Sequence, residues 1–114
     1  YGKEPPLSRN DSGALYDMIA PSSNALRPAG EWNQMRMRCE GARVEVELNG
    51  MQVVEADLDQ FDTPGINPDG TKNKFKYAWK TMPRVGHIGL QTHGGMDGAS
   101  GVQIRFRNLV VKAL

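Results

Sequence analysis

His93 has the residue type and the sequence position that proton transfer requires. It is one of two histidines in the chain, and it follows residues 87–91, where Ile88 and Leu90 alternate with other residues and predict a strand. A histidine placed where a strand gives way to a glycine-rich loop can reach solvent, and its imidazole titrates near neutral pH. His93 is therefore a candidate general base or acid, although a loop histidine that only hydrogen-bonds a turn gives the same pattern. His87 begins the predicted strand and is interpreted as structural.

Five further residues could bind a substrate or assist the histidine. Glu31, Trp32 and Asn33 stand where a loop enters the clearest predicted strand, and Gln91 stands at the end of the strand before His93. Trp32 can stack on a sugar ring, but a tryptophan at the start of a sheet strand is more commonly a core residue. Glu31 becomes chemically useful when another acid or a metal lies beside it. Arg107 can present its guanidinium to a substrate or hold a bulge through backbone hydrogen bonds.

Two other patterns are weaker guides to function. Aromatic residues interleaved with lysines can bind single-stranded nucleic acid, but a half-exposed strand gives the same pattern. The residues are Phe75, Tyr77 and Trp79 with Lys72, Lys74, Lys76 and Lys80. The net charge of +1 and the scattered basic residues argue against a nucleic-acid partner. Several aspartates between residues 57 and 69 fit no regular calcium-loop spacing.

Composition favours one small all-β domain. The chain has 114 residues, of which 13 are glycine and 7 proline, and its apolar residues come in short alternating runs. Cys39 is the one cysteine, which excludes an internal disulfide and a cysteine-rich metal site. No apolar run reaches membrane-spanning length, so no membrane partner is expected. The polar, aperiodic residues 1–12 do not look like the natural start of a domain.

The elements that would position these residues are mostly antiparallel strands. Alternation predicts three consecutive strands between residues 33 and 56, and Asn49 with Gly50 predicts a tight hairpin turn between the last two. Residues 14–19 form a shorter strand candidate, and residues 75–79 are either a strand or a loop that presents aromatic side chains. Residues 57–74 should form a long irregular loop. Alternation over residues 102–106 and 109–113 predicts a final strand with a bulge or bend between the two runs.

An ordered set of short motifs gives the chain a family resemblance. GEWN at residues 30–33, CEG at 39–41 and LNG at 48–50 look like the central hairpin of a concanavalin A-like β-sandwich. The motifs GALY at 13–16, GHIGLQTHG at 86–94 and FRN at 106–108 narrow the resemblance. Together they resemble the 3-keto-disaccharide hydrolases, also described as 3-keto-glucoside lyase/hydratase domains. Each motif alone is weak, and their common order carries the resemblance.

The resemblance implies an antiparallel jelly-roll sandwich of which this chain is only part. The family domain is about twice as long, and the match begins near residue 13, so residues 1–114 are expected to be a single domain or the C-terminal half of one. A half-sandwich exposes sheet edges and an apolar face. Either a missing N-terminal half or another copy of the chain is expected to cover that face. Residues 95–101 look like an insertion that can reshape the mouth of the site.

The resemblance also implies carbohydrate chemistry. The family acts on sugars oxidised at C3, cleaving the glycosidic bond by elimination and hydration or by hydrolysis. His93 would be the base or acid and Glu31 a less certain catalytic partner, while Gln91, Arg107, Trp32 and Asn33 would bind substrate. A divalent metal could serve as the electrophile, but no cofactor is certain and the metal ligands cannot be identified. A non-catalytic sugar-binding sandwich is the alternative, and the expected location is periplasmic or extracellular.

Overall fold

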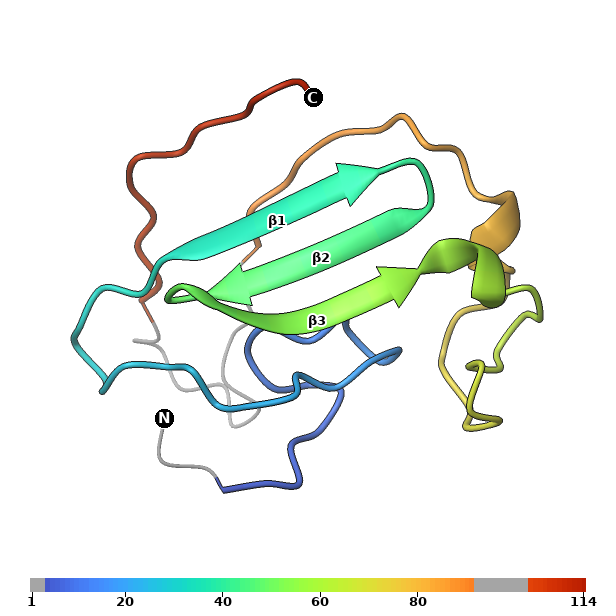
Figure 1. Ribbon diagram of the computed structural model, residues 1–114, viewed down its shortest axis with the longest axis horizontal. Coiled ribbons are helices and arrows are strands. Elements are labelled where there is room, and N and C mark those ends of the chain that lie inside the picture. Colours follow the sequence, from blue (N-terminus) through green and yellow to red (C-terminus); the bar gives the residue numbers. More distant parts are fainter. Residues whose placement is uncertain (1–3, 92–102) are drawn as a thin grey trace. The chain divides into compact units, whose positions relative to one another are not determined.

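The computed structural model describes residues 4–91 and 103–114. The chain divides into two compact units, residues 1–84 and residues 85–114. The first unit contains all the regular elements of the described residues, which form an open sheet and two short 3-10 turns (Figure 1). They are β1 (Met35–Glu40), β2 (Arg43–Leu48), β3 (Met51–Asp57), η1 (Leu58–Gln60) and η2 (Trp79–Thr81). The described part of the chain has no α-helix, so the predicted all-β class is confirmed. Nor does that part include a helix of the length and apolarity needed to cross a bilayer.

The three strands form a continuous antiparallel meander. Their order is β1, β2, β3, as predicted for residues 33–56 (Figure 1). In the turn between β2 and β3, Asn49 has a φ of 52° and Gly50 a φ of 83°. A type I′ turn needs positive φ at both central residues, so the predicted hairpin is confirmed by its backbone conformation.

One face of β2 and β3 forms the core of the first unit. Its inward side chains are at most 7% exposed. They are Val44, Val46, Leu48, Val53, Val54 and Ala56. The register shifts between Val46 and Glu47, and this irregularity lets the consecutive residues Val53 and Val54 both be buried. The cover over this face comes from the segment before β1 and the turn after β3, through Leu15, Ile19, Ala25, Leu26 and Leu58.

The opposite face of the sheet is charged and exposed. Arg36 on β1 pairs with Glu47 on β2 at 2.6 Å, and Arg43 on β2 pairs with Glu45 at 2.7 Å and with Glu55 on β3 at 2.8 Å. The hydrogen bond that Arg43 donates to the carboxylate of Glu45, and then the charge of Glu55, raise the pKa of the Arg43 guanidinium. Exposed pairs of this kind contribute little to stability, so this face is mainly a solvated surface.

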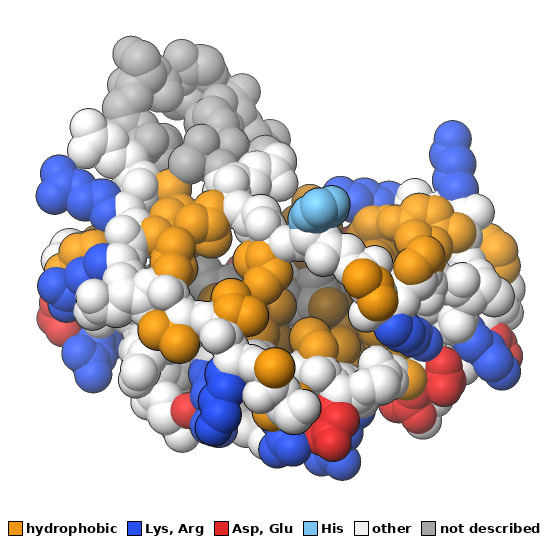
Figure 2. All heavy atoms as spheres, turned by 90° about the horizontal axis from the view of Figure 1, so that it is seen from above, with side chains coloured by type: hydrophobic (Ala, Val, Ile, Leu, Met, Phe, Trp, Pro, Cys, Tyr) orange, Lys and Arg blue, Asp and Glu red, His pale blue; other side chains and the backbone are white. Residues whose placement is uncertain are grey.

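The apolar side of β1 is exposed, unlike that of its neighbour. Met35, Met37 and Cys39, here called the open row, pair in register with Leu48, Val46 and Val44, so they lie on the core side of the sheet. Met35 is 52% exposed and Met37 60% exposed, and Cys39 is a free, exposed thiol. In the space-filling view, apolar side chains likewise reach the surface in several places (Figure 2).

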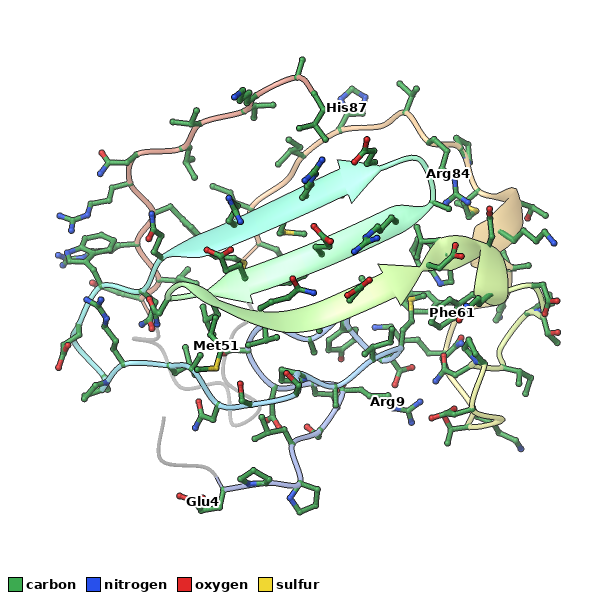
Figure 3. The ribbon with its side chains drawn as sticks, in the orientation of Figure 1. Glu4, Arg9, Met51, Phe61, Arg84 and His87 are labelled. Carbon is green, nitrogen blue, oxygen red and sulfur yellow. The ribbon has the colours of Figure 1, made fainter. Side chains whose placement is uncertain are left out.

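A polar clamp ties the cover segment to the long loop after β3. The Nη1 of Arg9 donates to the Oγ1 of Thr71 at 3.0 Å, and the backbone N–H of Lys74 donates to the Oδ2 of Asp17 at 2.7 Å. The buried side chain of Asn67, 3% exposed, donates to the carbonyl of Asp17 at 3.4 Å and to the Oγ1 of Thr71 at 3.1 Å. In the view of Figure 3, Arg9 lies below β3.

The predictions for three segments outside the main strands have different outcomes. The predicted strand over residues 14–19 is wrong, because Leu15 and Ile19 form only a single bridge around a turn in which Asp17 has a φ of 61°. The apolar residues of that run pack on the sheet instead of joining it. Residues 57–74 are irregular after η1, as predicted. Residues 75–79 are the loop alternative, since they lead into η2 without a strand.

The second unit contains no strand among its described residues. Residues 85–91 and 103–114 make no ladder, so the strands predicted for 87–91, 102–106 and 109–113 are wrong for the parts that are described. Alternation indicates which residues share a face, but a strand also needs a hydrogen-bonded neighbour. Asn108 has a φ of 54°, a left-handed backbone conformation at the point where the alternation changes phase. Ile88, Leu90 and the apolar residues of 104–114 are half to mostly exposed.

Candidate functional site

Asn33 occupies a structural position at the base of a loop. Its Oδ1 accepts hydrogen bonds from the backbone N–H of Arg27 at 2.9 Å and from the Nδ2 of Asn49 at 2.8 Å. Asn49 also donates to the carbonyl of Ala25 at 2.7 Å and accepts from the N–H of Gln34 at 2.8 Å. The two asparagines therefore join the loop before β1 to the hairpin turn between β2 and β3. The substrate-binding role predicted for Asn33 remains a prediction.

Trp32 and Glu31 lie on the same loop, just before β1. Trp32 is 42% exposed, so the interpretation of this tryptophan as a core residue is wrong. Glu31 is exposed, and its backbone N–H donates to the carbonyl of Pro28 at 3.1 Å, which closes a turn. The loop thus presents an indole face and a carboxylate side by side in sequence, fixed at its base by Asn33 and Asn49. An indole and a carboxylate are groups that can stack on a sugar ring and hydrogen-bond its hydroxyls.

The other candidates lie elsewhere in the chain. Gln91 and Arg107 are exposed residues of the second unit, and Arg107 immediately precedes Asn108, whose φ is positive. His93 lies outside the described residues. The structure therefore groups Glu31, Trp32 and Asn33 on one loop, and the complete six-residue site remains a prediction.

The carboxylates of the described residues offer no ready metal centre. No group of three or more His, Cys, Asp or Glu side chains converges among residues 4–91 and 103–114. A hollow of about 630 Å³ near the end of β3 is lined by Glu40, Arg43, Glu55, Asp57 and Asp59, among others. Three of its acids are paired, Glu40 with Arg38 at 2.8 Å, Glu55 with Arg43 at 2.8 Å and Asp59 with Arg84 at 2.9 Å. The acids of the hollow are therefore largely balanced by arginines. The spacing of these acids in the sequence did not predict the hollow.

An aromatic cluster precedes and begins η2. The ring of Trp79 meets Phe75 edge-on at 5.1 Å between centroids and Tyr77 edge-on at 5.3 Å. Phe75 and Tyr77 are 5.8 Å apart and tilted by 39°. The Nε1 of Trp79 is buried and has no hydrogen-bond partner, which makes it the one such side-chain atom of the described residues. Sequence alternation identified these three residues but not their mutual contact.

Comparison with known proteins places the chain in a family. A family model described as the 3-keto-alpha-glucoside-1,2-lyase-like domain matches residues 2–112. The chain belongs to this family. The family predicted from the ordered motifs is thus confirmed, and the loop with Glu31, Trp32 and Asn33 lies inside the matched region of this 3-keto-alpha-glucoside-1,2-lyase-like chain.

One solved structure is also similar to this chain. It is a protein of Parabacteroides distasonis titled "Putative glycosyl hydrolase", which is 31% identical to this chain with a TM-score of 0.60. The alignment covers 62% of this 3-keto-alpha-glucoside-1,2-lyase-like chain and 38% of the Parabacteroides protein. The chain therefore matches well under half the length of that relative. No curated protein matches the chain.

Proposed function

We propose that the protein containing this chain cleaves the glycosidic bond of sugars oxidised at C3. The observation that carries the proposal is the family match over residues 2–112. The similarity to a protein titled as a glycosyl hydrolase supports the same broad chemistry. The specific use of 3-keto substrates rests on the family description alone.

The reaction needs three kinds of group. A base removes the proton on C2, which the neighbouring keto group at C3 makes acidic, and the resulting enolate must be stabilised. The electron pair of the enolate then expels the glycosidic oxygen from C1, and an acid protonates that leaving oxygen. Addition of water across the C1–C2 double bond gives the free 3-keto sugar, so the net reaction is hydrolysis.

We assign these roles to the residues that the motifs single out. His93 transfers the proton, because its imidazole can act as base and acid near neutral pH. Gln91 and Arg107 bind hydroxyls or developing negative charge, and the exposed indole of Trp32 provides a stacking face for the sugar. The carboxylate of Glu31 is the less certain catalytic partner of His93, and Asn33, which lies beside it in sequence, binds substrate. A divalent metal, if bound, would polarise the keto oxygen, and Glu31 is the carboxylate among the candidates that could contact it.

We further propose that the sheet belongs to a concanavalin A-like jelly-roll sandwich. The support comes from its two unlike faces, one charged and one apolar, which suit an outer layer of a sandwich. The open row of Met35, Met37 and Cys39 would then pack against a second layer. That layer would come from chain beyond these 114 residues or from a second copy.

A sugar-binding module without catalysis is the second candidate function. It is favoured by the 42% exposure of Trp32, since a half-exposed indole suffices for binding and needs no catalytic partner. β-Sandwiches serve both roles, so the fold does not decide between them. Release of product from a 3-keto-disaccharide distinguishes the two functions.

The enzymatic proposal is tested by comparing the turnover of two histidine variants of the complete protein. We expect His93→Ala to lower kcat/KM for a 3-keto-disaccharide by roughly 100- to 10,000-fold, the usual contribution of a general acid or base. His87→Ala is the matched control, because His87 is the other histidine and is exposed, and it should leave turnover within about twofold of wild type. Unchanged turnover with His93→Ala would refute the assignment of His93. Saturable sugar binding with no product from the wild-type protein would favour the binding module.

A further inference from the structure

A second aromatic surface lies in the first unit, on residues that the proposed chemistry does not use. It consists of Tyr16, Lys74, Phe75, Tyr77 and Trp79, here called the aromatic patch. The Nζ of Lys74 lies 4.2 Å from the ring centroid of Tyr16 and 5.7 Å from that of Phe75. Phe75 in turn contacts Tyr77 at 5.8 Å. These contacts link side chains from two distant segments into one connected row.

The patch combines exposed ring surface with a fixed support. Tyr16, which lies under the Lys74 ammonium, is 51% exposed, and Tyr77, which contacts two other rings, is 39% exposed. Trp79 supports the row from one side by meeting both Phe75 and Tyr77 edge-on. Such edge-to-face pairs hold the rings in defined orientations. The exposed ring of Tyr77 is therefore held in place by its neighbours, which lowers the entropy cost of binding a ligand on it.

Backbone hydrogen bonds fix both segments of the patch. The N–H of Lys74 donates to the Oδ2 of Asp17, next to Tyr16 in sequence, at 2.7 Å. On the other side, the N–H of Lys80 donates to the carbonyl of the buried residue Phe61 at 3.1 Å, and this anchors η2. The rings of Tyr16 and Tyr77 thus rest on anchored backbone, although they come from segments about sixty residues apart.

The chemistry of the patch suits an uncharged, amphipathic ring. Aromatic faces favour the C–H groups of a pyranose, while the Lys74 ammonium and the tyrosine hydroxyls can hydrogen-bond its hydroxyl groups. A polyanion is a poorer fit, because the carboxylate of Asp17 lies beside the Lys74 backbone and the chain carries a net charge of only +1. A long apolar ligand would leave the Lys74 ammonium without hydrogen-bonding partners from the ligand.

We infer that the aromatic patch is a carbohydrate-binding surface that takes a hexopyranose unit of a glycan. The choice of a sugar over other amphipathic rings rests on the proposed function. The binding role itself rests on the ring geometry, the exposure of Tyr16 and Tyr77, and the position of Lys74. The patch holds substrate or product through residues other than those assigned to bond cleavage.

Binding can be measured with methyl α-D-glucopyranoside, an unoxidised sugar that the proposed elimination cannot cleave. Saturation-transfer NMR on the 114-residue chain and on the complete protein should show contact with one face of the sugar ring. Titration of the sugar should also shift the signals of Tyr77 and Trp79. We expect Tyr77→Ala to weaken binding about tenfold, the loss expected when one aromatic contact is removed, and Tyr16→Ala to weaken it less. Tyr77→Phe keeps the ring and should retain most of the binding.

Met37→Ala is the matched control, since it removes an exposed apolar side chain from β1 outside the patch. Equal binding by wild type, Tyr77→Ala and Tyr16→Ala would overturn the inference, and so would no binding by wild type. Concentration-dependent self-association lost in Tyr77→Ala, or tight binding of oligo-dT instead of the sugar, would also overturn it. Turnover of a 3-keto-disaccharide by the complete protein is scored separately. If the wild-type protein binds the sugar in a way that depends on Tyr77 but does not turn over the 3-keto-disaccharide, the proposed function is contradicted and the binding surface is not.

Discussion

β1 and β2 carry the same alternating apolar pattern, but the apolar side chains of β2 are buried and those of β1 are exposed. Leu48 and Val46 on β2 are 2% and 3% exposed, whereas their direct cross-strand partners Met35 and Met37 are 52% and 60% exposed. All four side chains lie on the same face of one sheet. Alternation therefore predicts which side of a strand is apolar, and a different part of the chain decides whether that side is covered.

The cover over β2 and β3 is an irregular segment. Leu15, Ile19, Ala25 and Leu26 pack on the core side chains from residues that form no strand or helix. The polar clamp holds part of this segment in place. The stability of the first unit therefore depends on a loop packed over β2 and β3, whereas β1 buries little apolar surface.

The largest expected difference between β2 and β1 is the loss of stability when the two members of one cross-strand pair are truncated separately. Leu48→Ala removes a side chain that is 2% exposed and should lower the free energy of unfolding by about 2–5 kcal/mol. Met35→Ala, at the paired position on β1, should cost less than about 1 kcal/mol because the side chain is already half in water. Urea unfolding followed by circular dichroism measures both. Equal losses would mean that the open row is buried in solution.

The cover itself can be disturbed at Gly13. This glycine is buried with a φ of +89°, and a Cβ added there would lie 3.1 Å from the Cγ2 of Val53. Gly13→Ala should therefore cost roughly 1–2 kcal/mol from backbone strain, with a further loss as Val53 shifts. Gly30→Ala is the control, since its φ is +91° but no atom lies within 4 Å of the added Cβ. Thermal unfolding of the two variants separates strain from contact, and equal melting temperatures would contradict close packing of the cover on β3.

The smallest expected effect is on the stability of the polar clamp at acid pH. The hydroxyl of Thr71 and then its backbone N–H lower the pKa of Asp69 from 3.8, and the same hydroxyl accepts the hydrogen bond from Arg9. Because the folded pKa is depressed, the stabilisation by Asp69 is present above pH 3.8 and is lost as pH falls through the lower, folded pKa. Stability below that pH should therefore fall less steeply in Asp69→Asn than in wild type. Identical slopes in pH-dependent unfolding would exclude a role of Asp69 in the clamp.

The features of the fold that could be predicted from the sequence are those that depend on residues close together in the chain. Strand alternation and the Asn49 and Gly50 turn define the hairpins, because each depends on neighbours within a few residues. The segment around Leu15 was predicted as a strand, since alternation cannot distinguish a ladder from apolar residues that pack on another sheet. The strands predicted in the second unit failed for a related reason, because pairing needs a neighbouring strand that sequence alone does not provide.

The candidate site was predictable in part. The motifs led to the correct family and placed Glu31, Trp32 and Asn33 on one loop. Burial was misjudged for Trp32, because residue type sets only an average tendency to be inside. The hydrogen bonds of Asn33 to Arg27 and Asn49 depend on residues brought together by the hairpin, so no local pattern contained them. The aromatic patch also joins distant segments, and Tyr16 carried no signal of its contact with Lys74.

We propose that the protein cleaves a 3-keto glycoside through loss of the C2 proton. The most direct measurement follows a 3-keto-disaccharide with the complete protein in D₂O by NMR. The account predicts release of the leaving sugar together with deuterium at C2 of the 3-keto product, and loss of both in His93→Ala. Cleavage of the unoxidised disaccharide at the same rate, or cleavage of the 3-keto sugar without deuterium at C2, would contradict it.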